Sequence, residues 1–372
     1  MQQYRVEFFE NVIDGQGRHK LEYRHHDFSE TLTIDDDYLA IQTTIIDLGA
    51  TDKIKTGQII RILRDDEDCF LGVVSDASPG EYSSTVSFKP LIALFDSDVL
   101  FDTDDQLAHD EEHSLENTLK KYIEDSFRNN SDSLQNYPID ITVPSHGNHT
   151  VNWGMNIKSD VEGAKRAIIG LYGVLIVNAL KNFGVAINAT ANFETGRISL
   201  SIGKINGTSL IDADLDNVEV VTLKVNDRPN GVNKLVVYNT ENFSNTMTFY
   251  AHTDHTWDNS NTDRISPVVR DLKTATPDSE IQDRQLAFQL AALQVAYDEL
   301  SGLTWDNLIE IKCAPNDPLV NPTRMQIGQE VSLLYKGCTY ISILTGKSVS
   351  FEDVTLTFGS ERIKFTKKRI SK

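Results

Sequence analysis

The stretch that most constrains the fold is residues 325–366, which predicts a run of short β-strands. Apolar and polar residues alternate there with a period of two in three runs, 331–335, 340–344 and 354–358. Lys336-Gly337 and Thr345-Gly346 separate the runs and are expected to form turns. Alternation with period two, broken by glycine-containing turns, is typical of an antiparallel meander.

Residues 56–88 form a near-copy of this stretch. The matched positions are Gly57-Gln58 with Gly328-Gln329, Cys69 with Cys338, Val73-Val74 with Ile343-Leu344, and Thr85 to Phe88 with Thr355 to Phe358. Upstream of each copy lies a second pair of similar segments, 32–37 followed by 45–48 and 210–214 followed by 220–223. Two matched blocks in the same order favour a duplicated β-domain, although two unrelated meanders would also resemble each other. The second block is divided by about a hundred residues, so no fixed-period repeat is indicated.

The charge balance excludes some classes of partner. The chain has 35 Lys and Arg against 55 Asp and Glu, a net charge of −20. A general nucleic-acid-binding protein would show a basic patch, and anionic membranes attract basic segments, so neither partner is indicated. An acidic surface suits solubility or the repulsion of a polyanion.

Cysteine usage and the termini indicate the compartment. Cys69, Cys313 and Cys338 form an odd, sparse set without CxxC spacing, so we expect three reduced thiols rather than a disulfide framework or zinc site. The N-terminus lacks the basic and apolar regions of a signal peptide. The apolar segment 167–180 is too short to span a bilayer and is expected to form a buried helix.

The order of patterns predicts a mainly β protein with α+β insertions: two related antiparallel β-barrels plus helix-containing domains. We expect a first β-barrel at 1–103, an α+β domain at 104–207, the start of the second barrel at 208–238, a hairpin and helix insertion at 239–304, and the rest of that barrel at 305–372.

Three helices are expected. One follows the cap residue Ser114. A second ends at Gly184 and begins either at the capping box 159–162 or near Gly170. The longest runs from Pro277 to Gly302, and its predicted buried stripe is Leu286, Leu290, Leu293, Tyr297 and Leu300.

The sequence gives little sign of catalytic chemistry. The acidic run 102–113 is better explained as a solvated linker than as a calcium loop, and His146 and His149 as loop residues. The most site-like segment is His252-Thr253-Asp254-His255, which could bind a metal together with Asp258 and Asp263. Hydrolase, P-loop, zincin and dinucleotide motifs are missing. We therefore assign no catalytic, cofactor-binding or metal-binding residue.

Taken in order, the β-block 70–88, the acidic linker and helix, the segment 170–189 and the block 327–366 resemble the baseplate hub or tail-tip protein of tailed phages, which is related to the tail-associated lysin of siphophages and to the hub of contractile baseplates. The resemblance implies two similar β-barrels, the second interrupted by an insertion. It also implies three subunits forming a pseudo-sixfold ring that matches a hexameric tail.

The same resemblance implies a structural protein of the virion tail tip, made in the host cytoplasm, which closes the tail tube and opens for DNA during ejection and host attachment. The implied partners are two further copies of the chain, a distal tail protein, other baseplate or receptor-binding proteins and the tape measure protein. Viral DNA would only pass through the lumen, and no stable membrane binding is expected. Many relatives carry a C-terminal lytic or fibre domain, and this sequence stops soon after the second barrel, so we expect no enzymatic activity. A cell-wall hydrolase using the 252–255 region, or the hub of an injection or secretion machine, stay open as alternatives.

Overall fold

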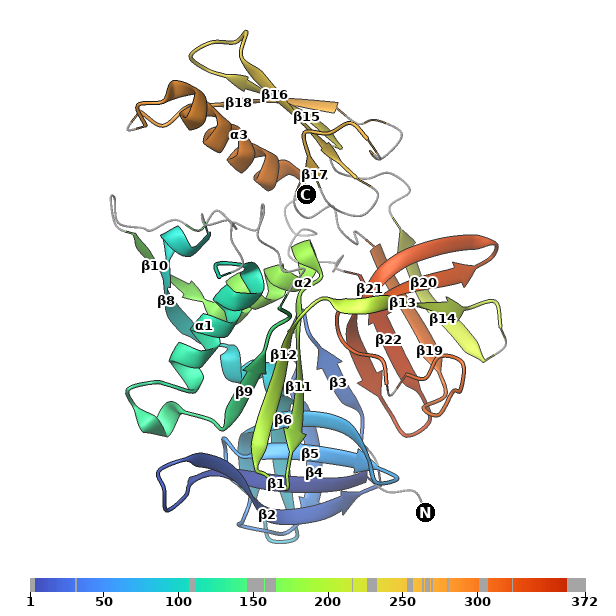
Figure 1. Cartoon of the computed structure of the whole chain (residues 1–372). Coiled ribbons are helices and arrows are strands. Elements are labelled where there is room, and N and C mark those ends of the chain that lie inside the picture. Colours follow the sequence, from blue (N-terminus) through green and yellow to red (C-terminus); the bar gives the residue numbers. More distant parts are fainter. Residues whose placement is uncertain are drawn as a thin grey trace, which may run out of the picture.

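The computed structural model describes residues 4–30, 32–106, 112–145, 157, 165–215, 217–225, 233–252, 257–262, 264, 268, 270–279, 281–300, 307–322 and 324–359. Within these residues the protein is mainly β. Two curled sheets and a helix-containing region between them form the body of the molecule, and a small α/β unit lies at one end (Figure 1).

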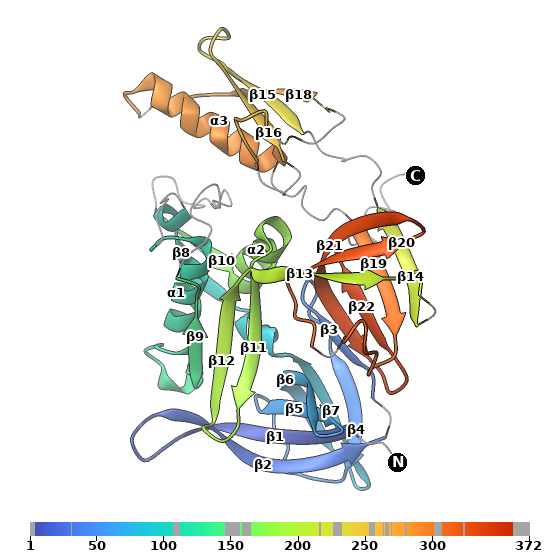
Figure 2. The ribbon, with the colours of Figure 1, turned by 45° about the vertical axis from the view of Figure 1, so that its right-hand side comes forward.

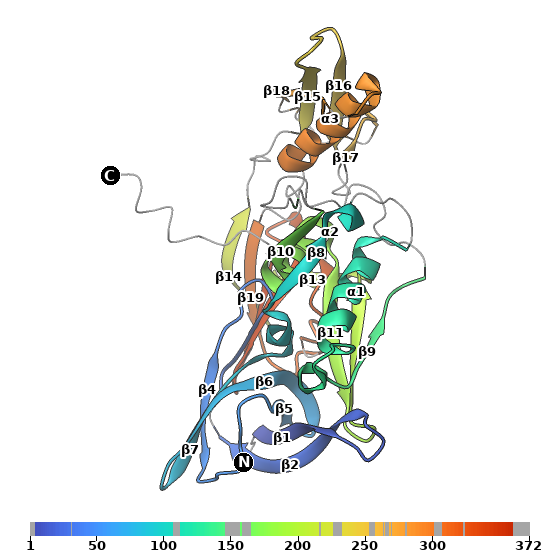
Figure 3. The ribbon, with the colours of Figure 1, turned by 90° about the vertical axis from the view of Figure 1, so that its left-hand side faces the viewer.

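The first sheet is antiparallel throughout and has the strand order β2-β1-β5-β6-β7-β4. Its strands are β1 (Tyr4–Ile13), β2 (His19–Ser29), β4 (Thr44–Gly49), β5 (Ile59–Arg64), β6 (Glu67–Pro79) and β7 (Ser83–Pro90). The sheet curls into a half-barrel (Figure 3). Alternate side chains such as Val6, Phe8, Ile60 and Phe88 are completely buried on the concave face, as period-two alternation requires.

The second sheet has the order β13-β20-β21-β22-β19-β14. Its strands are β13 (Ile205–Asp212), β14 (Val218–Val225), β19 (Asn307–Cys313), β20 (Gln329–Tyr335), β21 (Cys338–Val349) and β22 (Val354–Phe358). β13 runs parallel to β20, and the remaining pairs are antiparallel. The expected mainly β fold with two related half-barrel sheets is therefore present.

The turn that opens each meander repeats in detail. Gly57 and Gly328 have φ of +86° and +87°, a conformation that glycine adopts without strain. The N–H of Gly57 donates to the carbonyl of Val74 at 2.8 Å, and the N–H of Gly328 donates to the carbonyl of Leu344 at 2.8 Å. The glutamine after each glycine accepts a hydrogen bond from the backbone N–H three residues before it, at 2.9 Å in the first sheet and 3.2 Å in the second.

The hairpins and bulges repeat as well. The first hairpin of each meander has a two-residue turn, Asp65-Asp66 in the first sheet and Lys336-Gly337 in the second. Both residues of each turn have positive φ, which matches the twist of the flanking strands. The next strand pair of each sheet contains a β-bulge at the same place. The register of β6 with β7 shifts directly after Val74, and the register of β21 with β22 shifts directly after Leu344. The predicted duplication of the meander is thus confirmed, but Thr345-Gly346 forms a bulge within β21 rather than a turn.

The expected match between the upstream segments is wrong. β3 (Ile34–Asp37) pairs with β21 of the second sheet and so does not belong to the first. Residues 45–48 lie in β4 beside β7, whereas residues 220–223 lie in β14, which is separated from β22 by β19. One edge of β22 pairs with β21. Its other edge pairs with β19, the strand that follows the insertion. The position of β4 is therefore taken by β19.

The region between the sheets contains all elements from residue 91 to 203. They are η1 (Leu91–Phe95), β8 (Asp98–Asp102), η2 (Thr103–Gln106), α1 (Leu115–Phe127), η3 (Ser133–Gln135), β9 (Ile139–Thr142), β10 (Arg166–Gly170), η4 (Leu171–Ile176), α2 (Val177–Phe183), β11 (Ala186–Asn192) and β12 (Arg197–Gly203). Because β8 pairs with β10, this region begins before the expected boundary at residue 103. The Ser114 hydroxyl caps α1 by accepting from the N–H of Asn117 at 3.3 Å. α2 ends at Gly184, whose φ is +67°, as predicted.

The continuous helix of η4 and α2 begins at Leu171, which agrees with the second of the two expected starts. The capping box 159–162 lies outside the described residues. Among the helices of the described ranges, none is both long and apolar enough to cross a membrane.

The insertion has its own hydrophobic core. Figure 2 shows its sheet and α3 at one end of the molecule. Its sheet, β17-β16-β15-β18, contains β15 (Lys234–Asn239), β16 (Thr246–Ala251), β17 (Trp257–Asp258) and β18 (Arg270–Ala275), and α3 (Arg284–Leu300) packs on it. The first part of the second barrel was expected to end at residue 238. That boundary falls inside the insertion sheet, because β15 pairs with β16 and β18.

The predicted buried stripe of α3 is wrong in its first half, although Leu300 is buried and Leu293 packs against the core of the insertion. Phe288, Ala292 and Ala296 are fully buried against the sheet, whereas Leu286 and Leu290 are 46% and 47% exposed. Small alanines let the helix approach the sheet closely, and Phe288 fills the remaining space. The helix carries two apolar faces, and apolar spacing alone does not tell which of them is covered.

Candidate functional site

The feature that links all three parts of the body is the segment from β3 to Tyr38. In the pairing of β3 with β21, Ile34 lies opposite Val349, and Asp36 lies opposite Lys347. A strand that comes from within the first block of the sequence thus adds to the second sheet. This pairing makes the two sheets one connected unit rather than two independent domains.

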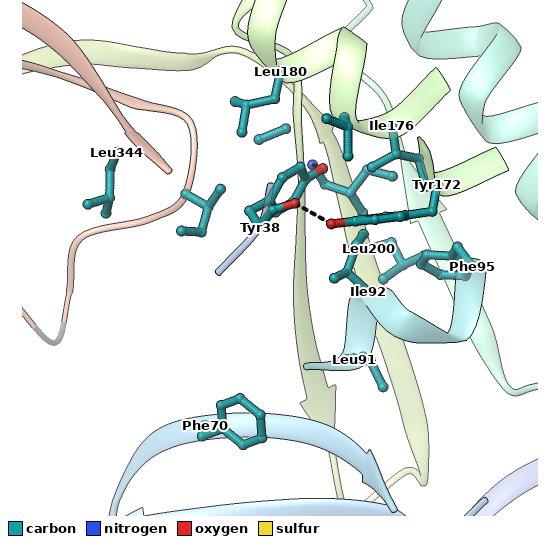
Figure 4. Packing of buried hydrophobic residues seen from close by; sticks show 14 of the residues in the cluster. Tyr38, Phe70, Leu91, Ile92, Phe95, Tyr172, Ile176, Leu180, Leu200 and Leu344 are labelled. Atoms are coloured by element: carbon teal, nitrogen blue, oxygen red, sulfur yellow. Dashed lines mark hydrogen bonds between the residues drawn. The ribbon is translucent and has the colours of Figure 1, made fainter. Parts of the chain in front are cut away.

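Tyr38 continues the junction directly after β3. Its backbone N–H donates to the carbonyl of Thr345 in β21 at 3.1 Å. Its carbonyl accepts from the hydroxyl of Tyr172 at 2.9 Å, and its own hydroxyl accepts from the N–H of Ile187 at 2.9 Å. Figure 4 shows the two tyrosines meeting among buried aliphatic side chains. A single residue therefore binds β21, η4 and β11 together.

Burial further stabilises the neutral form of both tyrosines. Burial raises the pKa of Tyr172 to about 12, and burial also raises the pKa of Tyr38 far above its ordinary value. Both side chains are neutral phenols at physiological pH. They hold the junction by hydrogen bonds and carry no charge for acid–base chemistry.

Arg64 forms a second contact between the sheets. Its guanidinium donates to the carbonyls of Ser350 and Phe351 at 3.3 and 2.8 Å and lies 5.4 Å from the centre of the Phe351 ring. Arg64 stands at the end of β5, and both carbonyls belong to the turn after β21. A planar guanidinium with several donors suits two adjacent carbonyl oxygens.

A cavity of about 410 Å³ lies beside this junction, between the first sheet, β11 and the segment 324–327. Asp36 and Lys347 line it together with Arg61 and Asp68. Burial raises the pKa of Asp36 to about 6 and lowers the pKa of Lys347 to about 8, and the charge of each partly offsets the effect on the other. The Lys347 ammonium donates to the carbonyl of Met325, so the lysine already has a structural role.

The segment predicted to be most site-like is only partly described. The Nε2 of the buried His252 lies 2.9 Å from the Oδ1 of Asp258. Thr253, Asp254, His255 and Asp263 lie outside the described residues, as do His146 and His149. In the part of the chain that is described, no group of three or more His, Cys, Asp or Glu side chains could hold a metal ion.

The carboxylates at the start of the acidic run 102–113 are engaged in local contacts. Asp105 accepts from Lys121 and from the hydroxyl of Tyr122 at 2.8 and 2.7 Å, and Asp104 pairs with Lys165 at 2.6 Å. These contacts tie η2 to α1 and to the residue before β10. The start of the run is thus packed into the fold, and the expectation of a solvated linker is wrong for residues 102–106.

The three cysteines are free thiols, as predicted. Cys313 is buried, Cys69 is partly buried and Cys338 is exposed. Burial raises the pKa of Cys69 and of Cys313 to about 12, so neither is a thiolate nucleophile at neutral pH.

The residues of the junction were not singled out from the sequence. Asp36, Tyr38, Arg64 and Lys347 carry no motif, and their partners lie more than a hundred residues away along the chain in most cases. The one available signal was the run Asp35-Asp36-Asp37, because Asp is depleted in β-strands.

Comparison with known proteins adds fold similarities. No protein-family model matches the sequence, and no curated protein matches it. The solved structures similar to it include phage tail and baseplate proteins. The 43 kDa tail protein of prophage MuSo2 from Shewanella oneidensis is 13% identical with a TM-score of 0.49, and a tail protein from Neisseria meningitidis MC58 is 12% identical with a TM-score of 0.48; both alignments cover 96% of each chain. A chain of the phage P2 baseplate in its activated conformation is 13% identical with a TM-score of 0.43, covering 98% of this chain and 100% of that one.

Proposed function

We propose that this chain is the structural hub subunit of a phage tail tip or baseplate, and that three copies form a closed ring. The observation that carries the proposal is the duplicated meander, with its matched glycine turns and hydrogen bonds in the two sheets. Three chains with two similar sheets each present six similar faces to a sixfold neighbour.

The junction supports this role mechanically. β3 pairing, Tyr38 and Arg64 fix the angle between the two sheets through several independent contacts. A ring closes only if the rotation from one similar sheet to the next is the same throughout the ring. A stiff connection between its two sheets is therefore what such a subunit requires.

The acidic balance fits a passage for DNA. A subunit with a net charge of −20 repels phosphate, so that DNA would slide through the lumen without binding to it. We propose a distal tail protein, the tape measure protein and other baseplate or receptor-binding proteins as neighbours in the virion. We assign no catalytic, cofactor-binding or metal-binding residue and propose no bond-cleaving activity.

Native mass spectrometry of the purified protein tests the proposal. The expected mass is about 125 kDa, three times the 41.7 kDa of one chain. A mass of one chain that does not change with concentration, or a stable dimer, would overturn the ring. A peptidoglycan turnover assay with and without chelator tests the hydrolase alternative, and we expect no turnover in either condition.

A further inference from the structure

A second pocket, of about 280 Å³, lies between the two sheets and shares Cys69 and Lys347 with the cavity described above. The buried part of its lining is apolar and comes from the second sheet and the loop before β20, namely Pro315, Pro322, Val349 and Val354. An exposed, acidic part of the lining comes from the hairpin between β5 and β6 of the first sheet, namely Asp65, Glu67 and Asp68. A segment that filled this pocket would therefore touch both sheets.

The cations that line the pocket are engaged with backbone carbonyls. The Arg64 guanidinium donates to the carbonyls of residues 350–351, and the Lys347 ammonium donates to the carbonyl of Met325. The hairpin presents four consecutive exposed carboxylates, residues 65–68. Among the described residues, Glu67 has no ion pair. The mouth of the pocket therefore suits a basic partner, and its apolar floor suits an apolar side chain.

The sequence contains a segment of that chemistry, residues 360–372, which lies outside the described residues. It has six Lys or Arg and one Glu, so it carries a charge of +5 in a chain whose total is −20, and residues 1–359 carry −25. Apolar Ile363 and Phe365 alternate there with Arg362, Lys364 and Thr366. In an extended conformation the apolar side chains would project to one side and the basic side chains to the other.

The segment begins within reach of the pocket of its own chain. Val354, at the start of β22, lines the pocket, and the chain bends at Gly359, where φ is +90°. The strand carries the chain roughly 17 Å from Val354 to Gly359, and an extended chain from Gly359 to Phe365 spans roughly 20 Å. Phe365 can therefore return to the pocket, and a segment of the same chain has a high effective concentration there.

We propose that residues 360–372 fold back over the junction and insert Phe365 into this pocket, with the flanking lysines against the carboxylates of residues 65–68. The ring supplies most of the stabilisation, because aromatic side chains bury a large apolar area. Exposed ion pairs contribute little one by one, so the lysines mainly guide the segment to the acidic hairpin. The bound segment would be a further link between the two sheets. The proposal does not depend on the ring of three subunits.

Photo-cross-linking at the ring tests the proposal. p-Benzoylphenylalanine replaces Phe365 in the full chain, and in a control it replaces Phe243, which is 62% exposed in the insertion. A mixture of isotope-labelled and unlabelled protein distinguishes adducts within one chain from adducts between copies. We expect the Phe365 probe to form adducts within one chain, in peptides that contain residues 65–69, 315–322 or 347–354. The control should give no adduct in these peptides.

The other outcomes each overturn the proposal. Adducts in the same peptides of a second copy would mean that the segment is exchanged between subunits. Adducts in other peptides, or no adduct at all, would mean that the pocket is not its site. A basic segment also attracts nucleic acid. If the probe gives no adduct in the pocket and cross-links instead to an added DNA duplex, DNA is the partner.

A matched pair of charge variants gives an independent readout. Asp65→Lys with Glu67→Lys reverses two carboxylates of the pocket. Lysine is tolerated in this turn, because Lys336 has the same positive φ at the matching position of the second sheet. Asp52→Lys with Glu81→Lys makes the same charge change at two exposed positions outside the pocket.

Trypsin cleavage within residues 362–369 reports how accessible the segment is, because trypsin cuts after Lys and Arg. We expect cleavage there to be at least tenfold faster in the pocket variant than in the control variant, followed by intact mass. Phe365→Ala should accelerate it as well, although it leaves every charge in place and changes no residue of the folded body. Equal cleavage rates in the two charge variants, or no acceleration by Phe365→Ala, would overturn the proposal.

Discussion

Removing one oxygen from Tyr38 should loosen the junction between the sheets. In Tyr38→Phe the N–H of Ile187 loses its acceptor at a fully buried position, while the backbone bond from Tyr38 to Thr345 is kept. A buried donor left without a partner costs about 1–3 kcal/mol. Tyr172→Phe leaves the buried carbonyl of Tyr38 without its donor, which also costs about 1–3 kcal/mol. We therefore expect each variant to loosen the junction by a similar amount.

Hydrogen exchange followed by mass spectrometry measures the loss of stability around Tyr38 peptide by peptide. A local measurement is needed because the chain has two separate hydrophobic cores. A loss of about 1–3 kcal/mol corresponds to faster exchange by about 5- to 150-fold in peptides that contain Ile187. Peptides from α3, whose core is separate, should not change. Tyr82→Phe removes the same atom from a side chain that is 85% exposed and serves as the control. If Tyr38→Phe exchanges like Tyr82→Phe around Ile187, the bridging role of Tyr38 is wrong.

Three further predictions follow from the same contacts. The folded-state pKa of Asp36 is about 6, above its ordinary 3.8, so the stability of the fold rises as the pH falls through 6. The folded-state pKa of Lys347 is about 8, below its ordinary 10.5, so the stability of the fold rises as the pH increases through 8. Urea midpoints should thus be lowest between pH 6 and 8. Asp36→Asn should flatten the acidic side and shift the basic rise to lower pH, because the Asp36 charge holds the pKa of Lys347 up. A midpoint that peaks between pH 6 and 8 would contradict this. Gly359→Ala should lower the melting temperature more than Gly57→Ala, because both glycines have positive φ but only at Gly359 would the added carbon overlap the Asn307 carbonyl; equal losses would contradict it. Alkylation of the denatured protein without reductant should modify all three cysteines, and mass spectrometry showing fewer would contradict the free thiols.

The features that the sequence predicted well are those that local chemistry determines. A glycine at φ near +87°, a two-residue hairpin turn and alternating side chains leave the same pattern wherever they occur. The two copies of the meander could therefore be matched at their turns and strand ends, from Gly57 and Gly328 to Phe88 and Phe358. The expected match of Cys69 with Cys338 is wrong, because Glu67 occupies the place of Cys338 directly after the hairpin turn. The cap at Ser114 and the helix end at Gly184 were predicted for the same reason.

The features that it missed depend on contacts between distant segments. Nothing local tells that β3 leaves the first block to pair with β21, or that β19 rather than β14 lies beside β22. Strand order is determined by which free edge a returning strand can reach. The junction around Tyr38 could not be predicted either, because a tyrosine, a backbone N–H and a second tyrosine carry no sequence signature. For α3, two apolar faces competed for one sheet, and the alanine face packed against it.

Electron microscopy of the purified full chain tests the central claim most directly. The two sheets share a meander and are held at a fixed angle by β3, Tyr38 and Arg64, so three chains should form a ring with six similar lobes around a central passage. Class averages with threefold symmetry and six lobes are the predicted result. Single elongated particles with the 41.7 kDa mass of one chain, or twofold dimers, would contradict the account.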